Sequence, residues 1–208
     1  MAKRWNVKIV DDFVDIGMPK YKCPFHKVWR LLMKRTQDVI YKSEHNSLID
    51  NSCCDLFLRF SDFKVWMKTQ DWEGKVLDKD LLGGGLKFYS PETCVFIPKY
   101  LNNAIQRFPR GRNLMGVEDS YKGLPKKYKA IIADFTTKKN VNLGYFDSEE
   151  DAHRAWQEAK VEYFLTVLKY YKLKNNNERV EEGINKIILR LKNDIEKSLP
   201  TFEFLKDR

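Results

Sequence analysis

The chain has 208 residues, of which 43% are hydrophobic and 13% aromatic, so it can bury one ordinary core or two small ones without disulfides or a metal. Lys and Arg outnumber Asp and Glu by 38 to 29, and the formal net charge of +9 is typical of proteins that meet phosphate. No run approaches the roughly 18 apolar residues of a membrane helix, and residues 1–5 lack the apolar core of a signal peptide. We therefore expect a cytoplasmic protein without a membrane partner.

The four cysteines fit no secreted disulfide framework, because Cys53 and Cys54 are adjacent and cannot easily form an unstrained bridge. Cys23 and His26 have the spacing of half a zinc knuckle, but no matching second half follows. We expect reduced thiols that pack as small hydrophobic groups.

Two helical segments are predicted in the first third of the chain. Residues 24–39 form a basic amphipathic helix, with an apolar stripe at Phe25, Val28, Trp29, Leu32 and Met33. Residues 56–66 place Phe60, Phe63 and Trp66 on one side, and packing in a core is a better account of these rings than stacking on a ligand.

Shorter elements are predicted between residues 71 and 103. The pattern indicates a strand at 75–78, a glycine turn at 83–85, a short strand at 86–89, and a helix that begins at Ser90-Pro91-Glu92 and runs toward Asn102. No Gly-Lys-Ser or Gly-Lys-Thr follows the glycines, so a phosphate loop is not expected there.

A basic linker at 107–112, containing Arg107, Arg110 and Arg112, separates this part from the rest. Beyond it, residues 127–135 and 140–146 alternate like two strands joined by a polar turn. If Tyr128, Ala130 and Ile132 face the core, then Lys127, Lys129, Ile131 and Ala133 face outward, together with Asn140 and Asn142.

Two helices are predicted at the end of the chain. Ser148 is an N-cap with acids behind it, and the following helix has the stripe Ala152, Ala155, Trp156, Ala159 and Tyr163. An amphipathic helix at 178–198 then carries Val180, Ile184, Ile187, Ile188, Leu191 and Ile195 on one face. That face must be buried against this chain or against a second copy in a homodimer.

The second half resembles the APETALA/ethylene-response-factor DNA-binding domain. The motifs are Tyr128-Lys129-Ala130-Ile131-Ile132, then Leu143-Gly144-Tyr145-Phe146, then Ser148-Glu149-Glu150-Asp151-Ala152 and Ala155-Trp156-Gln157-Glu158-Ala159-Lys160, with Gly116-Val117 where the family's first strand begins. The resemblance implies a three-stranded antiparallel sheet backed by a helix, with its outer face in the major groove of double-stranded DNA. In this chain, Met115, Glu118, Asp119 and Ser120 stand near the first strand, where plant members carry outward arginines and tryptophans, so the base code does not transfer.

The side chains expected to hold or read DNA come from the linker, the strands and their turn. Lysine and arginine reach phosphate or guanine, and asparagine pairs bidentately with adenine. The predicted DNA-binding set is Arg107, Arg110, Arg112, Lys127, Lys129, Lys138, Lys139, Asn140 and Asn142.

The first half is similar to the HNH endonucleases that phages couple to such a domain. The stretches are Val28-Trp29-x-x-Leu32-Met33-x-Arg35, Phe60-Ser61-Asp62-Phe63-x-x-Trp66, Leu77-Asp78-Lys79-Asp80 and Tyr89-Ser90-Pro91-Glu92-Thr93-Cys94. The resemblance places Asp80 at the family's aspartate, Pro91-Glu92-Thr93 at its helix start, and Asn102, 22 positions after Asp80, at its final ligand. It implies a catalytic set of Asp80, Asn102 and Asp78, with Asp80 and Asn102 holding Mg²⁺ or Mn²⁺.

One departure affects the chemistry. Leu81 stands where the family has the histidine that takes a proton from the attacking water, and leucine can neither accept a proton nor orient a water. A metal-bound hydroxide or His45 from a loop are the alternatives. For Asp78 and Asp80, a solvated acidic strand end is as good an account as a metal site.

We thus expect an α+β protein with a degenerate HNH module of the ββα-metal kind at 1–106, an APETALA-like module at 113–173 and a helical tail. The expected function is sequence-specific binding of double-stranded DNA, with nuclease activity impaired or lost, as in a repressor, within a bacterial or phage-infected cell. The alternatives are an active metal-dependent homing endonuclease or nickase, and an interaction or inhibitor protein that does not bind DNA.

Overall fold

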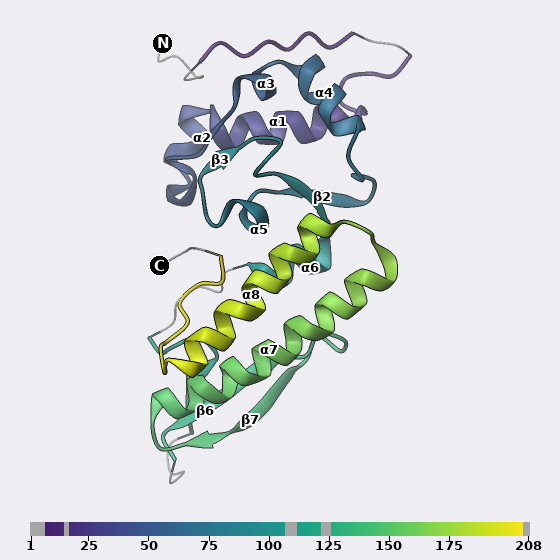
Figure 1. Cartoon of the computed structure of the whole chain (residues 1–208). Coiled ribbons are helices and arrows are strands. Elements are labelled where there is room, and N and C mark those ends of the chain that lie inside the picture. The colour runs from purple at the N-terminus through teal and green to yellow at the C-terminus, as the bar shows by residue number, and fades with distance from the viewer. Residues whose placement is uncertain (1–6, 15–16, 107–111, 122–125, 206–208) are drawn as a thin grey trace. The chain divides into compact units, whose positions relative to one another are not determined.

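The computed structural model describes residues 7–14, 17–106, 112–121 and 126–205, and it confirms a mixed α+β fold (Figure 1). The chain divides into two compact units, and the boundary in the sequence falls between Asn102 and Asn103. Unit 1 is the part before this point, and unit 2 is the part after it. None of the described helices is both long enough and apolar enough to cross a membrane.

Unit 1 contains short helices and two small sheets. Its helical elements are α1 (Pro24–Thr36), α2 (Val39–Ser43), the 3-10 turn η1 (Asn46–Leu48), α3 (Asp55–Leu58), α4 (Phe60–Lys68) and α5 (Asp80–Gly83), with α6 (Lys99–Ile105) beginning at its end. Its strands are β1 (Ser52–Cys53), β2 (Lys75–Asp78), β3 (Phe88–Tyr89) and β4 (Val95–Pro98). β1 pairs in parallel with β3, and β2 pairs in antiparallel with β4.

The core of unit 1 forms where α1 meets α3 and α4. Pro24 starts α1 at a position where its missing N–H costs no helical hydrogen bond. The predicted stripe is buried at Trp29, whose indole N–H donates to the carbonyl of Phe57 at 2.8 Å. Phe60 and Phe63 lie in the same core, as predicted.

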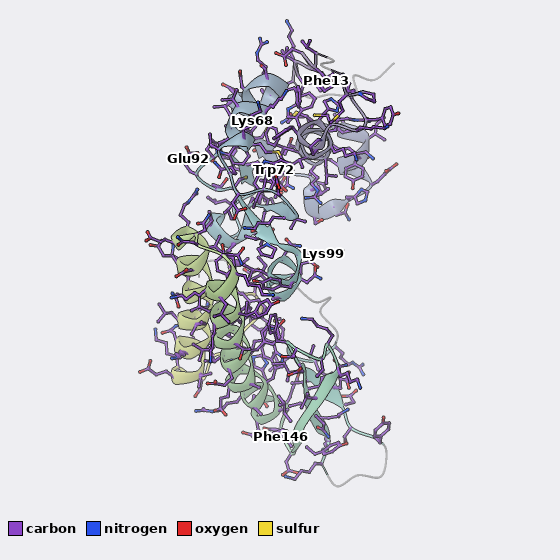
Figure 2. The ribbon with its side chains drawn as sticks, turned by 90° about the vertical axis from the view of Figure 1, so that its right-hand side faces the viewer. Phe13, Lys68, Trp72, Glu92, Lys99 and Phe146 are labelled. Carbon is purple, nitrogen blue, oxygen red and sulfur yellow. The ribbon has the colours of Figure 1, made fainter. Side chains whose placement is uncertain are left out.

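The segment before α1 is held against this core at two points. The backbone N–H of Val10 donates to Leu58, and its carbonyl accepts from the N–H of Phe60, both at 2.9 Å. Phe13 packs on the rings of His26 and Phe60 (Figure 2). His26 is itself buried among these rings, and its Nε2 lies 3.2 Å from the carboxylate of Asp11.

The prediction of a helix that begins at Ser90-Pro91-Glu92 is wrong, because the chain there forms a turn followed by strand β4. The hydroxyl of Thr93 accepts from the N–H of Ser90 at 3.0 Å and donates to the carbonyl of Phe88 at 2.8 Å, which closes the turn. Residues 95–97 are β-branched or aromatic and are all buried, so pairing with β2 is favoured over a helix. The helix that carries Asn102 is α6, which begins only at Lys99.

Unit 2 has a three-stranded antiparallel sheet backed by a long helix, as expected. The strands are β5 (Val117–Asp119), β6 (Tyr128–Ala133) and β7 (Asn140–Phe146), in that order across the sheet. Helix α7 (Glu149–Lys174) packs on one face, where the small Ala152 meets Ala130 and Val117. Figure 1 shows α7 running alongside β6 and β7.

Helix α7 begins as the sequence predicts. The hydroxyl of Ser148 accepts from the N–H of Asp151 at 3.1 Å and donates to its carboxylate at 2.6 Å. Three acids in the first turn also lie at the positive end of the helix dipole. This cap fixes where the chain leaves β7 and turns onto the sheet.

The last helix, α8 (Glu178–Glu196), packs against α7 in the same chain. Its predicted stripe is buried at Val180, Ile184, Ile187, Ile188 and Leu191. Of the two alternatives for this stripe, burial within the chain is therefore the one observed. After α8, Thr201 ties the chain back to α7, because its N–H donates to Nε2 of His153 at 3.0 Å.

Candidate functional site

The acidic residues at the end of β2 serve the local backbone. Asp78 is buried, and its carboxylate accepts from the N–H of Leu81 at 2.8 Å, which starts helix α5. Burial is the main cause that raises the pKa of Asp78 to about 6, and the nearby charge of Asp80 adds to it. The carboxylate of Asp80 pairs with the ammonium of Lys79.

Asn102 is half-buried on α6, which begins directly after β4 of the β2–β4 pair. Asp78 pairs with Val95 at one end of the β2–β4 pair, and Lys75 pairs with Pro98 at the other end. The chain enters α6 after Pro98, at the end away from Asp78 and Asp80. Within the described residues, no hydrogen bond joins Asn102 to Asp78 or Asp80, and no group of three His, Cys, Asp or Glu side chains stands ready to hold a metal.

As they stand, these side chains fit Mg²⁺ or Mn²⁺ poorly. The ammonium of Lys79 lies where a cation would approach Asp80. Asp78 is buried and its carboxylate accepts from the N–H of Leu81, so it is less available as a ligand. The role of Asp80, Asn102 and Asp78 as a catalytic or metal set thus stays a prediction.

The two residues considered for the missing general base are also placed. Leu81 is only 3% exposed, so a side chain at this position is buried. His45 is exposed on the turn after α2, where its Nδ1 lies 2.8 Å from the carbonyl of Tyr41 and its ring lies on the Tyr41 ring.

The face of the unit 2 sheet turned away from α7 carries polar, charged and apolar side chains. Across an antiparallel pair, opposed residues share a face. Lys129 is opposed to Tyr145, Ile131 to Asn142 and Ala133 to Asn140, and all six are half-buried or exposed. We call these six residues, with Glu118 beside Lys129 on β5, the outer sheet face.

Two of the predicted DNA-binding side chains on this face have partners in the chain. The ammonium of Lys129 lies 3.9 Å from the carboxylate of Glu118, which is the opposed residue on β5. The amide oxygen of Asn142 accepts from the N–H of Gly144 at 3.0 Å. Asn140 is exposed and has no such contact among the described residues.

A β-bulge explains why the alternation misses Tyr145. The register shifts between Ala130 and Ile131, so that Leu143 and Gly144 both turn toward the α7 side. Tyr145 then comes onto the outer sheet face, while Phe146 packs inward. Simple alternation from Asn142 predicts that Tyr145 faces α7 and that Phe146 faces outward. The sequence signal for a bulge is the glycine at position 144, which has a φ of 138° in the structure.

The turn between β6 and β7 presents two lysines at the end of the sheet. The carboxylate of Asp134 accepts from the N–H groups of Thr136 and Thr137, which fixes the turn. Lys138 has a φ of 60°, and its ammonium lies 4.3 Å from the centre of the Phe135 ring. Lys139 beside it is exposed.

The remaining predicted DNA-binding residues belong to the linker and the start of β6. Arg112 and Lys127 are exposed. Arg107 and Arg110 lie outside the described residues. Lys126, which the sequence prediction does not include, is exposed next to Lys127 and adds to the same basic edge.

The acidic neighbours of His153 in the sequence indicate an exposed side chain. In the structure, however, His153 is buried, with only 3% of its surface exposed. Its Nδ1 lies 2.9 Å from the carbonyl of Met115, and its Nε2 accepts from Thr201. Burial lowers the pKa of His153, so the neutral ring is favoured. Its role is to join the start of β5 and the segment after α8 to α7.

Comparison with known proteins does not assign the chain to a family: no family model, curated protein or solved structure matches it.

Proposed function

We propose that the chain is a sequence-specific double-stranded DNA-binding protein of homing-endonuclease descent, with its nuclease activity impaired or lost. The observation that carries this proposal is the outer sheet face, which α7 leaves open and which carries polar and charged side chains. A slightly twisted sheet of this kind fits the major groove, which admits a β-ribbon as well as a helix.

The basic side chains lie around this face, where phosphates would flank the groove. Lys126 and Lys127 stand at the start of β6, and Lys138 and Lys139 stand at the turn that ends it. Contacts from such positions fix the register of the protein on DNA without reading bases. Asn140 and Tyr145 lie on the face itself, where they would meet base edges.

β2 and β4 pair in antiparallel, with α5 and β3 between them in the chain, and α6 follows β4 directly; a strand pair followed by a helix is in keeping with descent from a ββα-metal nuclease. Loss of cleavage is supported by three local features: the ammonium of Lys79 beside Asp80, the hydrogen bond that engages the buried Asp78, and the buried Leu81. A protein of this kind would occupy its site and act there as a repressor.

Replacing Lys127 and Lys129 with alanine together is expected to weaken binding to every DNA sequence. If both ammonium groups contact phosphate, the slope of log K against log salt becomes flatter by about two units. Fluorescence anisotropy with a labelled duplex, measured between low and physiological salt, gives the slope. An unchanged slope would remove both lysines from the interface.

The matched control for this pair is Glu118→Gln. It removes the carboxylate that lies beside Lys129 while keeping the size of the side chain. Because one negative charge leaves the face, affinity for all sequences is expected to rise. A fall in affinity would mean that Glu118 itself accepts from a base, as a glutamate can from cytosine.

Asn140→Ala is expected to relax the preference at one base position, by about 1–3 kcal/mol of discrimination. Selection from a randomised duplex pool, by the natural protein and by the variant, identifies that position. Asn142→Ala is the comparison, because its amide oxygen is engaged by Gly144 and its loss disturbs the bulge. Equal loss on all sequences in Asn140→Ala would contradict a reading role.

Supercoiled plasmid with Mg²⁺ or Mn²⁺ is expected to remain uncut by the natural protein. Leu81→His is expected to lower the stability of unit 1 without restoring cleavage, because an imidazole at this buried position lacks a partner. Cutting that disappears in Asp80→Ala would instead establish an active metal nuclease and overturn the assignment of lost activity.

A further inference from the structure

A cavity of about 1040 Å³ lies within unit 2, between the sheet, the first half of α7 and the segment after α8. Its lining includes Val117 from β5, Ile131 from β6, Trp156, Lys160 and Tyr163 from α7, and Phe202 from the last segment. Ligand cavities for small molecules have volumes of roughly 300–1,000 Å³ and mostly apolar walls with a few polar groups.

Lys160 is the unusual member of this lining. It is 4% exposed, and its ammonium lies 3.9 Å, 4.9 Å and 5.4 Å from the centres of the Tyr163, Phe164 and Phe204 rings. Throughout the part of the chain that the structure describes, no hydrogen bond or ion pair reaches it. The rings attract a cation, but they carry no net charge that would neutralise it.

The other buried polar groups around the cavity are satisfied within the chain. His153 uses both ring nitrogens, on Met115 and Thr201. The amide nitrogen of Gln157 donates to the carbonyl of Leu199 and to the hydroxyl of Thr201, both at 2.9 Å. These hydrogen bonds hold the side chains that line the cavity in place. The ammonium of Lys160 is a buried charge in this lining that has no ion pair among the described residues.

Four acidic side chains also line the cavity, and among the described residues no ion pair joins any of them to Lys160: Glu118, Glu149, Glu150 and Asp151. Glu149 accepts from the backbone N–H of Leu114, and Asp151 is held by the cap at Ser148. Glu118 lies 3.9 Å from Lys129. A buried ammonium without an anion is costly, so a ligand that brings a negative charge to Lys160 gains more than one that does not.

We propose that this cavity is a binding site for a small organic anion, whose charged group pairs with the ammonium of Lys160 and whose flat apolar body lies against Trp156 and Tyr163. A carboxylate or sulfonate on an aromatic ring system has this chemistry. DNA phosphate does not, because a duplex cannot reach a side chain that is 4% exposed. The cavity shares Glu118, Ile131, Ala133 and Asn140 with the outer sheet face, but the proposal is argued from Lys160 and does not depend on the function proposed above.

The test uses two fluorescent probes with the same ring system, anilinonaphthalene sulfonate, which is an anion, and phenylnaphthylamine, which is uncharged. The full chain is expected to bind the sulfonate saturably at one site. Lys160→Met keeps the length of the side chain and removes its charge, and it is expected to weaken sulfonate binding by about tenfold or more. Its affinity for the uncharged probe is expected to change little.

Lys169→Met is the matched control, because Lys169 lies exposed on the same helix and its loss removes the same charge from the surface. This variant is expected to bind both probes like the natural protein. Lys160→Arg, which keeps the charge, is expected to retain more sulfonate binding than Lys160→Met. The proposal is overturned if the natural protein shows no saturable sulfonate site, or if Lys160→Met loses both probes equally or neither.

Discussion

Replacing Gly116 with alanine is expected to destabilise unit 2 by about 3 kcal/mol or more. Gly116 has a φ of 77°, a region that L side chains rarely adopt, and an added Cβ would lie 1.9 Å from Cδ1 of Trp156. The indole cannot move aside easily, because Trp156 is 4% exposed and stacks on the rings of His153 and Phe204. The strand β5 that follows Gly116 would lose its place beside β6.

Gly74→Ala is the control for the backbone cost alone. Gly74 has a φ of 69°, but nothing lies within 4 Å of its added Cβ, so we expect a loss of about 1–2 kcal/mol. Urea denaturation gives the free energies of unfolding, and amide hydrogen exchange shows whether the loss is confined to β5, β6 and α7. Equal losses in the two variants would mean that the contact with Trp156 relaxes without cost.

Lys160→Met is expected to stabilise unit 2 by about 4 kcal/mol near neutral pH, because it removes the cost of burying the charged ammonium. Burial lowers the pKa of Lys160 to about 7, from 10.5. Between these values the unfolded chain holds a proton that the folded chain has released, so the free energy of unfolding of the natural protein rises with pH in this window. At and below pH 7 the natural protein carries the whole cost of the buried charge.

The measurement is the difference in free energy of unfolding between Lys160→Met and the natural protein, from pH 6 to pH 10 (roughly the window in which the linkage applies). It is expected to be largest at the acidic end and to shrink as pH rises. Lys169→Met, on the exposed side of α7, is expected to show no such trend. A difference that does not vary with pH would mean that Lys160 titrates in the folded chain as it does when unfolded.

Sequence periodicity and caps were sufficient to predict the elements with strong local signals. The apolar stripes of α1, α7 and α8, the Ser148 cap and the alternation of β6 all appear in the structure. The mixed fold follows from them, whereas the third strand of the sheet was expected only from the resemblance to the APETALA domain. These features depend on contacts within a few residues, so the local chain contains the information.

The failures all involve partners that are distant in sequence. Residues 95–97 form a strand because β2 supplies hydrogen bonds there, although Ser90-Pro91-Glu92 has the composition of a helix start. Tyr145 reaches the outer sheet face because a bulge, set by the pairing of β6 with β7, shifts the register. Neither pairing can be inferred from the local sequence.

The sequence alone identifies the basic and amide side chains that the proposals use, and the strand alternation indicates the approximate faces on which they lie. Only the tertiary structure decided which of them are available. Lys129 on β6 lies beside Glu118 on β5. His153 and Lys160 are buried because the segment after α8 returns to cover α7. The physical reason is that burial and charge pairing are properties of the surroundings of a side chain, and packing brings those surroundings from distant parts of the chain.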